Sequence, residues 1–377
     1  MKRLFALSFC CFFAFHTQAQ DYEELAFTID YRLDSIFKNH KAPGVSFSVV
    51  FPDGTARTFV KGFANVEKKL PMTTSSKMLG GSTGKVFYSV VALQLVEEGK
   101  ISLDQPIFQQ MKGYDWFDRL PNARTLTVRH LMRHQTGIPR YVFKPAFQEE
   151  VVKDVDKVWK PAELLSYVLD DDPLFEVGTR FEYSDTNYII LAMLMEEVTG
   201  EELYELVQKR VLDKAGLKDV VPQNKRNYAD LAQGYNADND PFYPGHALDE
   251  NEKTRYNIQF EWAGGGLVIT THDLAVLAKK IYEGEMFDKA LLDEYLDGVD
   301  AGQLVGEWGL GVHIQRTPEG KTFGHSGFMP GYITNMRYYQ DDRYAVCYQI
   351  NTSDRSKMSI MRGLSILSAM VSEELNK

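Results

Sequence analysis

The sequence predicts an α+β protein: one antiparallel β-sheet flanked by N-terminal and C-terminal helices, with a mostly helical insertion lobe. Strand-like segments gather near both ends of the chain, whereas the middle has mostly helical patterns. Neighbouring strand-like segments are joined by tight turns, which favours antiparallel pairing because parallel strands need long crossover connections. The 377 residues, 44% of them hydrophobic, are enough for one large domain or two lobes with an ample core.

The N-terminal half of the sheet is predicted as a helix followed by a hairpin. Residues 22–41 have an amphipathic helical pattern, which ends at Pro43. Residues 45–51 and 56–62 are rich in β-branched and aromatic side chains and enclose the turn sequence 52–55. We expect these two strands to pair.

A buried helix is predicted over residues 82–98, directly after two glycines. Its apolar residues recur at mixed steps of three and four, and Gly99 ends it. Ser82 therefore lies at a helix N-terminus, where free N–H groups and the helix dipole favour negative charge. Lys85 is on the same face, about 5–6 Å away between Cβ atoms. A hydroxyl beside an ammonium at this end of a helix suits an activated nucleophile.

Two other patterns resemble known motifs in this part of the sequence. A second Ser-x-x-Lys pattern at Ser35 and Lys38 lies in the middle of an amphipathic helix with no glycine turn before it, so we interpret it as a chance occurrence. A phosphate-binding loop would need glycine where Leu79 stands and Ser or Thr where Val86 stands. The phosphate-loop interpretation is therefore rejected.

The middle of the chain is predicted to be helical and to end in a long polar loop. The predicted helices begin at 128 or cover 161–169, 188–198 and 201–215, and the loop covers 224–255. His130 and His134 have the spacing of a zinc-binding pair, but Leu131 stands where a metalloprotease has its glutamate, and no third ligand follows. We expect two structural histidines, no metal and no cofactor.

The C-terminal part is predicted to complete the sheet and to close with a helix. The predicted elements are a strand after 262–267, a helix at 271–283, strands at 309–315, 334–339 and 344–350, and a helix at 357–375. The lobes are expected to divide at about residues 100 and 255: an α/β lobe from 21–100 and 255–377, and a helical lobe from 101–254.

The first 19 residues predict a secretory signal peptide. A basic start precedes an apolar run at 4–15, and small residues follow at the cleavage positions. This run is shorter than the about 20 residues of a retained membrane anchor. We expect a secreted or periplasmic domain of residues 20–377 without a stable membrane anchor; a lipid anchor on Cys10 or Cys11 is the less favoured alternative.

Charge and cysteine content limit the possible partners. The formal net charge is −10, and −12 after loss of the two basic leader residues, which disfavours nucleic acid and anionic membranes as partners. The mature chain keeps one cysteine, Cys347, so it has no internal disulfide. A cysteine in an apolar strand-like segment predicts a buried, inert thiol.

Two further segments are candidates for the site of Ser82 and Lys85. Tyr183 and Asp185 stand just before an apolar helix, where Asp185 could simply cap the helix. His325, Ser326 and Gly327 stand between strand-like segments, where such a sequence is by default a turn.

In chain order, Ser82-x-x-Lys85, Tyr183-x-Asp185 and His325-x-Gly327 resemble the three motifs of the serine β-lactamase and penicillin-recognising D,D-peptidase superfamily. The tyrosine resembles the branch of class C β-lactamases, D,D-carboxypeptidases and related esterases. Supporting similarity lies at 95–104, 130–137 and 263–267, within a resemblance that runs from about residue 43 to 351.

The resemblance implies roles for these residues. Ser82 would be the acylated nucleophile, Lys85 would tune its proton, and Tyr183 would carry a proton between Ser82 and the leaving group. The backbone N–H groups of Ser82 and Phe328 would form the oxyanion hole. The substrate-binding residues would be Asp185, His325, Ser326 and Gly327, in a cleft between an α/β lobe and a helical lobe.

Two departures from class C β-lactamases bear on activity. Asp185 stands where these enzymes commonly have Asn, and an ionised Asp offers only hydrogen-bond acceptors. His325 stands where they have Lys, and we expect it to titrate near pH 6.5 and to meet a substrate carboxylate. We also expect Asp185 to pair with Lys85 and keep it protonated, which leaves Tyr183 as the proton acceptor.

These residues favour a secreted serine hydrolase that forms an acyl-enzyme on Ser82. Its partner would be a small-molecule or peptide substrate: a D-amino-acid peptide, ester or amide. A peptidase or esterase is favoured over an efficient β-lactamase. The alternatives are a penicillin-binding sensor that is acylated without turnover and an inert member of the fold. The sequence makes no prediction of the oligomeric state.

Overall fold

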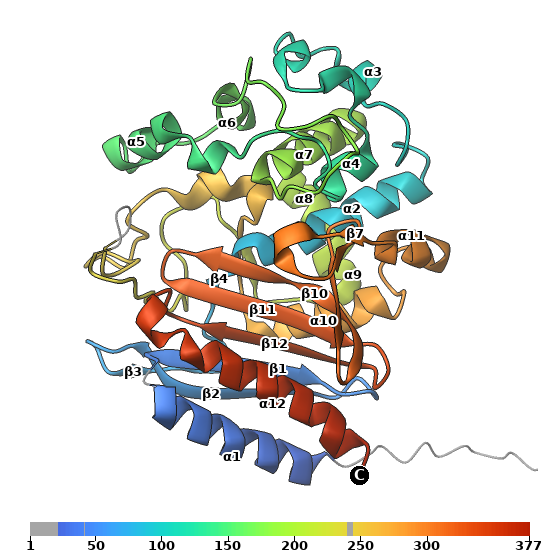
Figure 1. The fold of residues 1–377 in the computed structure, drawn as a ribbon. Helices are drawn as coiled ribbons and strands as arrows, with labels where there is room; N and C mark the ends of the chain where they lie inside the picture. The colour runs from blue at the N-terminus through green and yellow to red at the C-terminus, as the bar shows by residue number, and fades with distance from the viewer. Residues whose placement is uncertain (1–21, 41, 240–243) are drawn as a thin grey trace, which may run out of the picture.

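An antiparallel sheet of nine strands forms the lower half of the molecule (Figure 1). The computed structural model describes residues 22–40, 42–239 and 244–377, so the predicted signal peptide lies outside the described residues. The strand order is β3-β2-β1-β12-β11-β10-β9-β8-β7. The strands are β1 Gly44–Val50, β2 Ala56–Asn65, β3 Leu70–Pro71, β7 Val299–Asp300, β8 Glu307–Trp308, β9 His313–Thr317, β10 Gly320–Met329, β11 Tyr332–Tyr339 and β12 Tyr344–Ile350.

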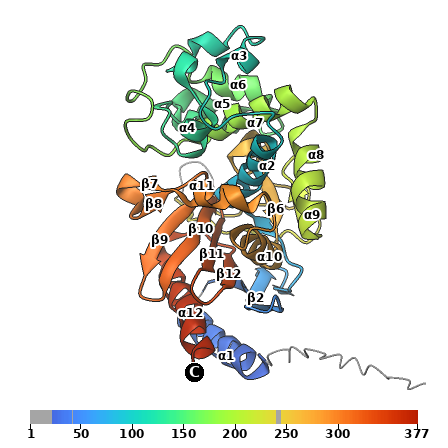
Figure 2. The same cartoon turned by 90° about the vertical axis from the view of Figure 1, so that its right-hand side faces the viewer.

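The two ends of the chain meet in the middle of this sheet, because β1 pairs with β12. Both strands are buried along their whole length, as expected where helices cover both faces. Helices α1 (Glu23–His40) and α12 (Ser359–Leu375) lie side by side on one face (Figure 1). Helix α10 (Thr271–Tyr282) covers the other face (Figure 2). The predicted α+β fold is confirmed.

The alternation of side chains along β1 matches these two layers. Its apolar residues Val45 and Phe47 belong to the core under α1 and α12. Ser46 and Ser48 point the other way, and each hydroxyl lies 2.7 Å from the Thr271 hydroxyl of α10. Because a strand repeats every two residues, a strand with serines on one face still buries a continuous apolar row on the other.

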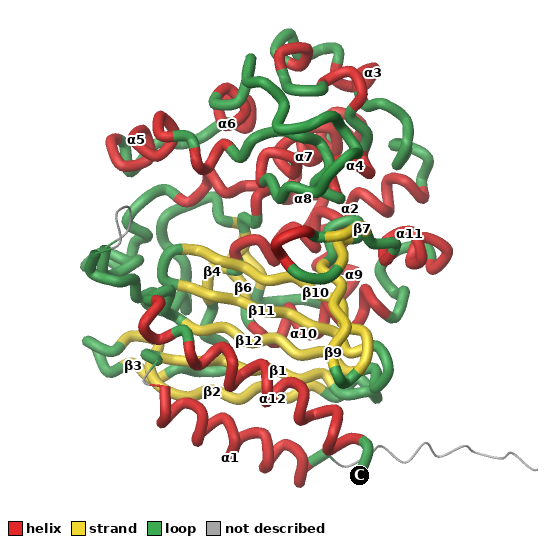
Figure 3. Tube along the Cα trace, viewed as in Figure 1, coloured by secondary structure: helices red, strands yellow, loops and turns green. Residues whose placement is uncertain are grey.

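A mostly helical layer lies beyond the β10 edge of the sheet, above the strands in Figures 1 and 2 and red above yellow in Figure 3. Its central helices α2 (Lys85–Glu97) and α7 (Asp185–Thr199) are buried for most of their length, as apolar residues on all sides require. The other helices are α3 Phe108–Met111, α4 Val128–Met132, α5 Pro145–Lys153, α6 Pro161–Ser166, α8 Leu203–Val207, α9 Asp213–Ala215 and α11 Leu292–Leu296. A small sheet has the order β4-β6-β5, with β4 Met78–Leu79, β5 Val220–Pro222 and β6 Leu267–Ile269.

Several predicted boundaries shift by a few residues. The predicted helix at 82–98 begins as a 3-10 turn, Gly81–Gly84, before α2. The predicted strand at 309–315 is replaced by β9, which begins at His313; Gly311, with φ +92, is not in an extended strand conformation. The segment from His325 to Phe328 is part of β10, so its default interpretation as a turn is wrong.

The segment after β5 makes contacts that bear on the division into lobes. Residues 220–254 were assigned to the helical lobe, yet Lys77 N–H donates to the Asp230 carbonyl at 2.8 Å, and Asn351 Nδ2 donates to the Gln233 carbonyl at 2.9 Å. These two hydrogen bonds join the 220–254 segment to residues that were predicted in the α/β lobe. The division at about residues 100 and 255 stays a prediction. Cys347 is buried in β12 as predicted, and burial raises the pKa of its thiol. Within the described residues, no helix is both long and apolar enough to cross a membrane.

Candidate active site

Ser82 lies in a 3-10 turn that is held by contacts between glycine backbones. Gly81 has φ +53, and a Cβ added there would lie 2.6 Å from the Phe328 carbonyl oxygen of β10. A Cβ added at Gly84 would lie 1.7 Å from the Gly265 carbonyl oxygen. Only glycine lets the turn touch both segments, so the two glycines around Ser82 bring it against β10 and the 264–266 loop.

The β10 strand offers a free edge beside this turn. Strand β9 pairs with β10 only over residues 320–324, so residues 325–329 have no strand on that side. A Cβ at Gly327 would lie 1.9 Å from the Gly80 carbonyl oxygen, which shows how closely the strand edge approaches the turn. The Phe328 nitrogen is 2.7 Å from the position of a Gly81 Cβ. The backbone N–H groups of Ser82 and Phe328 are thus on neighbouring segments, and Ser326 is exposed.

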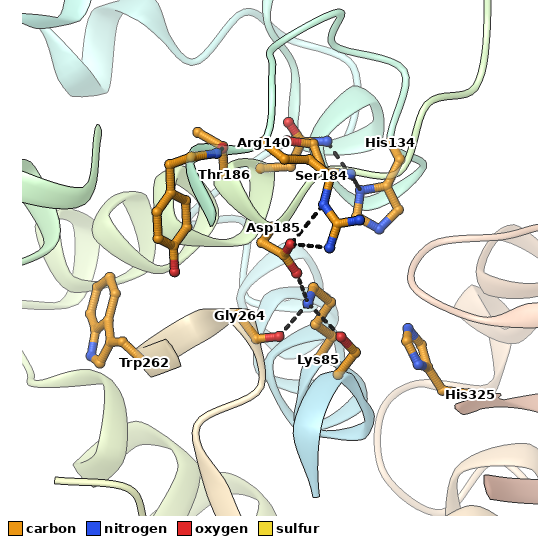
Figure 4. Close-up of polar contacts among 12 residues, drawn as sticks. Lys85, His134, Arg140, Ser184, Asp185, Thr186, Trp262, Gly264 and His325 are labelled. Atoms are coloured by element: carbon orange, nitrogen blue, oxygen red, sulfur yellow. Dashed lines mark hydrogen bonds and ion pairs between the residues drawn. The ribbon is translucent and has the colours of Figure 1, made fainter. Parts of the chain in front are cut away.

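The Lys85 ammonium is fully buried next to Ser82. Figure 4 shows Lys85 between Asp185 and Gly264. Its Nζ lies 3.2 Å from Ser82 Oγ and 2.8 Å from Asp185 Oδ1, and it also donates to the Gly264 carbonyl. These three acceptors match the three N–H bonds of an ammonium. Burial alone would lower the pKa of Lys85, but the Asp185 carboxylate raises it above its ordinary value. The expected Asp185–Lys85 pair is confirmed, and Lys85 is protonated at neutral pH.

Asp185 carries a second ion pair, with Arg140. Arg140 Nε and Nη2 lie 2.9 and 2.6 Å from Asp185 Oδ2. Figure 4 shows the Arg140 side chain directed at Asp185. Burial by itself raises the pKa of Asp185, yet Lys85 and Arg140 hold it well below its usual range. The carboxylate makes these bonds instead of capping α7. The capping alternative is therefore wrong, because among the described residues no side chain caps α7 through a hydrogen bond and both Asp185 oxygens accept from cations.

Tyr183 packs over Lys85 from the helical side. Lys85 Nζ lies 5.1 Å from the centre of the Tyr183 ring. The centres of the Tyr183 and His134 rings are 4.2 Å apart. The buried Tyr183 hydroxyl makes no hydrogen bond of normal geometry among the described residues, but it lies near enough to Ser82 and Lys85 for both groups to lower its pKa. Burial raises the pKa of Tyr183, and the opposing effect of Lys85 is smaller. Tyr183 is therefore a neutral phenol in the resting site.

His325 is almost completely buried, with 2% of its surface exposed. Its Nδ1 lies 2.6 Å from the Ser326 carbonyl oxygen, so Nδ1–H donates to it. Burial, helped by the Lys85 charge, lowers the pKa of His325 to about 3. The expected titration near pH 6.5 is wrong: His325 is neutral above pH 5 and offers no positive charge to a carboxylate.

The histidines at 130 and 134 do not share one helical face. Helix α4 ends at Met132, so His134 lies beyond it with φ +54. Its Nδ1 accepts hydrogen bonds from Ser184 N–H at 3.2 Å and from Asn187 Nδ2 at 3.1 Å. Across residues 22–40, 42–239 and 244–377, no three His, Cys, Asp or Glu side chains could hold a metal ion together.

A cavity of about 490 Å³ opens beside Ser82. One wall is apolar and comes from α5 and the segment before it. The lining residues are Ser82, Arg140, Val142, Phe143, Phe147, Gln148, Val151, Val152, Asp185, Phe260, Glu261, Phe328, Met329 and Pro330.

Sequence reasoning missed three components of this site: Arg140, Glu261 and the Gly264 carbonyl. Gly264 is inside the 263–267 segment that carried the family resemblance, and the two charged residues lie next to such segments. Arg140 follows the 130–137 segment, and Glu261 precedes the 263–267 segment. The sequence signal that could have indicated Arg140 and Glu261 is a charged residue close to a segment with family resemblance.

A serine hydrogen-bonded to a buried lysine, between an antiparallel sheet and a helical layer, is the arrangement of the serine β-lactamase and penicillin-recognising peptidase superfamily. The chain belongs to the beta-lactamase family, whose model matches residues 29–369.

Two known relatives are about a quarter identical to this chain over the aligned residues. It is 24% identical over 311 residues to penicillin-binding protein 4* of Bacillus subtilis (strain 168), covering 78% of this chain and 64% of that protein. It is 23% identical over 345 residues to D-aminopeptidase of Brucella anthropi, covering 90% of this chain and 62% of that protein. The chain thus spans less than two thirds of the length of these two relatives.

Among solved structures, the fold is similar to D-amino acid amidase from Ochrobactrum anthropi SV3 complexed with D-phenylalanine. The TM-score is 0.77 at 23% identity, over 92% of this chain and 98% of that one. At this identity the likeness concerns the fold.

Proposed function

We propose that this protein is a secreted serine hydrolase that cleaves peptides, amides or esters of D-amino acids through an acyl-enzyme on Ser82. The observation that carries the proposal is the 3.2 Å contact between Ser82 Oγ and the buried Lys85 ammonium, at the mouth of a cavity. The stereochemistry is supported by the relatives, a D-aminopeptidase and a D-amino acid amidase. The apolar wall of the cavity suits an apolar substrate side chain.

In the proposed reaction, Ser82 Oγ attacks the substrate carbonyl and the developing oxyanion is held by the N–H groups of Ser82 and Phe328. Tyr183, once deprotonated, takes the proton of Ser82 and passes it to the leaving group. Water then hydrolyses the ester on Ser82. Because Lys85 and Tyr183 are both protonated at rest, the pair must lose one proton first, so the acylation rate should rise with pH.

The site also supports a peptidase or esterase over an efficient β-lactamase. Asp185 is an ionised carboxylate that accepts hydrogen bonds from Lys85 and Arg140 on its two oxygens. It has no N–H to donate to a substrate amide carbonyl. His325 is neutral and cannot replace a fixed ammonium as a carboxylate anchor.

A fluorophosphonate probe followed by peptide mapping tests the nucleophile. We expect the adduct on Ser82, and loss of D-phenylalanine p-nitroanilide hydrolysis in Ser82→Ala but not in the matched control Ser35→Ala. Hydrolysis of the L-anilide at an equal rate would contradict the D-specificity, and an adduct on another serine would contradict the site. Stoichiometric labelling by penicillin without any turnover would favour the second candidate, a penicillin-binding sensor.

Secretion is a separate part of the proposal. Expression of the full chain in a Gram-negative host should give a periplasmic protein whose N-terminus starts close to residue 20. A protein retained in the cytoplasm with its leader intact would contradict it.

A further inference from the structure

Glu261 is a buried carboxyl in the wall of the active-site cavity. It lies in the 3-10 helix Ile258–Gly264, is 9% exposed and lines the same cavity as Ser82. A Cβ added at Gly265 would lie 2.8 Å from Glu261 Oε1 and 2.3 Å from the Gly81 carbonyl oxygen. Glu261 Oε1 and the Gly81 carbonyl oxygen are therefore at most the sum of these two distances apart. The carboxyl thus lies beside the peptide group that precedes Ser82.

Glu261 differs from the other charged groups of the site because it has no partner. Asp185 is bound by both Lys85 and Arg140. Among the described residues, no ion pair and no hydrogen bond stabilises the Glu261 carboxylate, and burial raises its pKa to about 7 despite the Lys85 charge. A buried carboxylate without a cation or donors is unfavourable. Its position in the cavity wall means that a ligand can supply them.

Building on the proposed function, we propose that Glu261 binds the α-ammonium group of the substrate, so that the enzyme selects D-amino-acid substrates with a free amine. An ammonium supplies positive charge and three N–H donors, which a carboxylate accepts in short, strong hydrogen bonds. In an acyl-enzyme the α-nitrogen is two bonds from the carbon attached to Ser82 Oγ. The amine must therefore lie within a few ångströms of Ser82, and Glu261 lines the same cavity as Ser82.

The rest of the cavity suits the other parts of such a substrate. Phe147, Val151 and Phe260 offer an apolar surface for the side chain. Arg140 is occupied by Asp185, so it does not compete for Glu261. The substrate class is therefore an N-terminal D-residue with an apolar side chain, as a peptide, amide or ester.

The test compares two p-nitroanilides that differ only in the amine: those of D-phenylalanine and of 3-phenylpropionic acid. In Glu261→Gln we expect KM for the D-phenylalanine anilide to rise about 10- to 100-fold, because charged hydrogen bonds are lost. KM for the amine-free anilide should stay the same. Glu261→Asp keeps the charge and should give an intermediate KM. Glu149→Gln, an exposed glutamate on α5, is the control and should change neither value.

A second measurement separates this inference from the proposed function. D-phenylalaninamide should protect Ser82 from fluorophosphonate labelling in the native protein but not in Glu261→Gln, while unprotected labelling rates and melting temperatures confirm that the variants are folded. Failure of the native protein to hydrolyse either anilide would contradict the proposed function, and the protection assay would still decide the role of Glu261. Equal loss of kcat for both anilides, or protection that is independent of Glu261, would overturn the inference; equal loss would make Glu261 a proton acceptor instead.

Discussion

Replacing Asp185 by Asn should move the pH dependence of acylation to lower pH. The substitution keeps the shape of the side chain and removes the charge that faces Lys85. At the 2.8 Å separation of Lys85 Nζ and Asp185 Oδ1, Coulomb's law with an effective dielectric constant of about 20 gives about 6 kcal/mol, or about four pKa units, as an upper bound. Measured pairs of this kind shift by about 1–3 units. Arg140 also loses its partner, and its uncompensated charge acts on Lys85 in the same direction.

The assay is kcat/KM for D-phenylalanine p-nitroanilide between pH 6 and pH 10.5. In the native protein the rate should rise across this range, because the pKa values of Lys85 and Tyr183 both lie above their ordinary values. In Asp185→Asn the rising limb should move down by about 1–3 pH units, so that kcat/KM at a given pH within the range exceeds the value expected from the native limb. The control is Asp170→Asn, which removes the exposed pair with Arg119 and should leave the profile unchanged.

An unshifted limb in Asp185→Asn would refute the reasoning, provided that the variant melts cooperatively and still reacts with fluorophosphonate. It would mean that the ionisation of Lys85 does not limit acylation. A shift to higher pH would contradict the sign of the electrostatic effect.

Three further predictions concern stability, packing and metal independence. His325 has a pKa of about 3 in the folded protein and about 6.5 in the unfolded chain, so the unfolded state binds more protons between these two values. The free energy of unfolding therefore falls as the pH falls through that window. In urea unfolding, His325→Gln should lose less stability between pH 7 and pH 4.5 than the native protein, and an equal loss would contradict this. Gly84→Ala should lower the free energy of unfolding by about 1–3 kcal/mol or more and abolish fluorophosphonate labelling of Ser82, because the new Cβ would overlap the Gly265 carbonyl. The control is Gly113→Ala, which has open space around the new Cβ and should melt like the native protein. Extended chelation should leave activity unchanged, and a loss that zinc restores would disprove metal independence.

Local patterns in the sequence determined most of the framework. The apolar run after Ser82 predicted the buried helix α2, and the hairpin around residues 52–55 predicted β1 and β2. These predictions succeed because φ and ψ preferences and the period of burial act over a few neighbouring residues. The order of the three motifs, which needs only the sequence, led to the family.

Tertiary structure decided the charge states and the partners within the site. Asp185 could cap its own helix or pair with Lys85, 100 residues away, and only the packing of α7 against α2 decides for the pair. His325 has an ordinary histidine pKa in any short peptide, and it is burial in the folded protein that makes it neutral. Glu261 looks like one acidic residue among many until its burial beside Ser82 leaves it without a partner. Solvation and long-range contacts set these properties, and neither is encoded in the neighbouring residues.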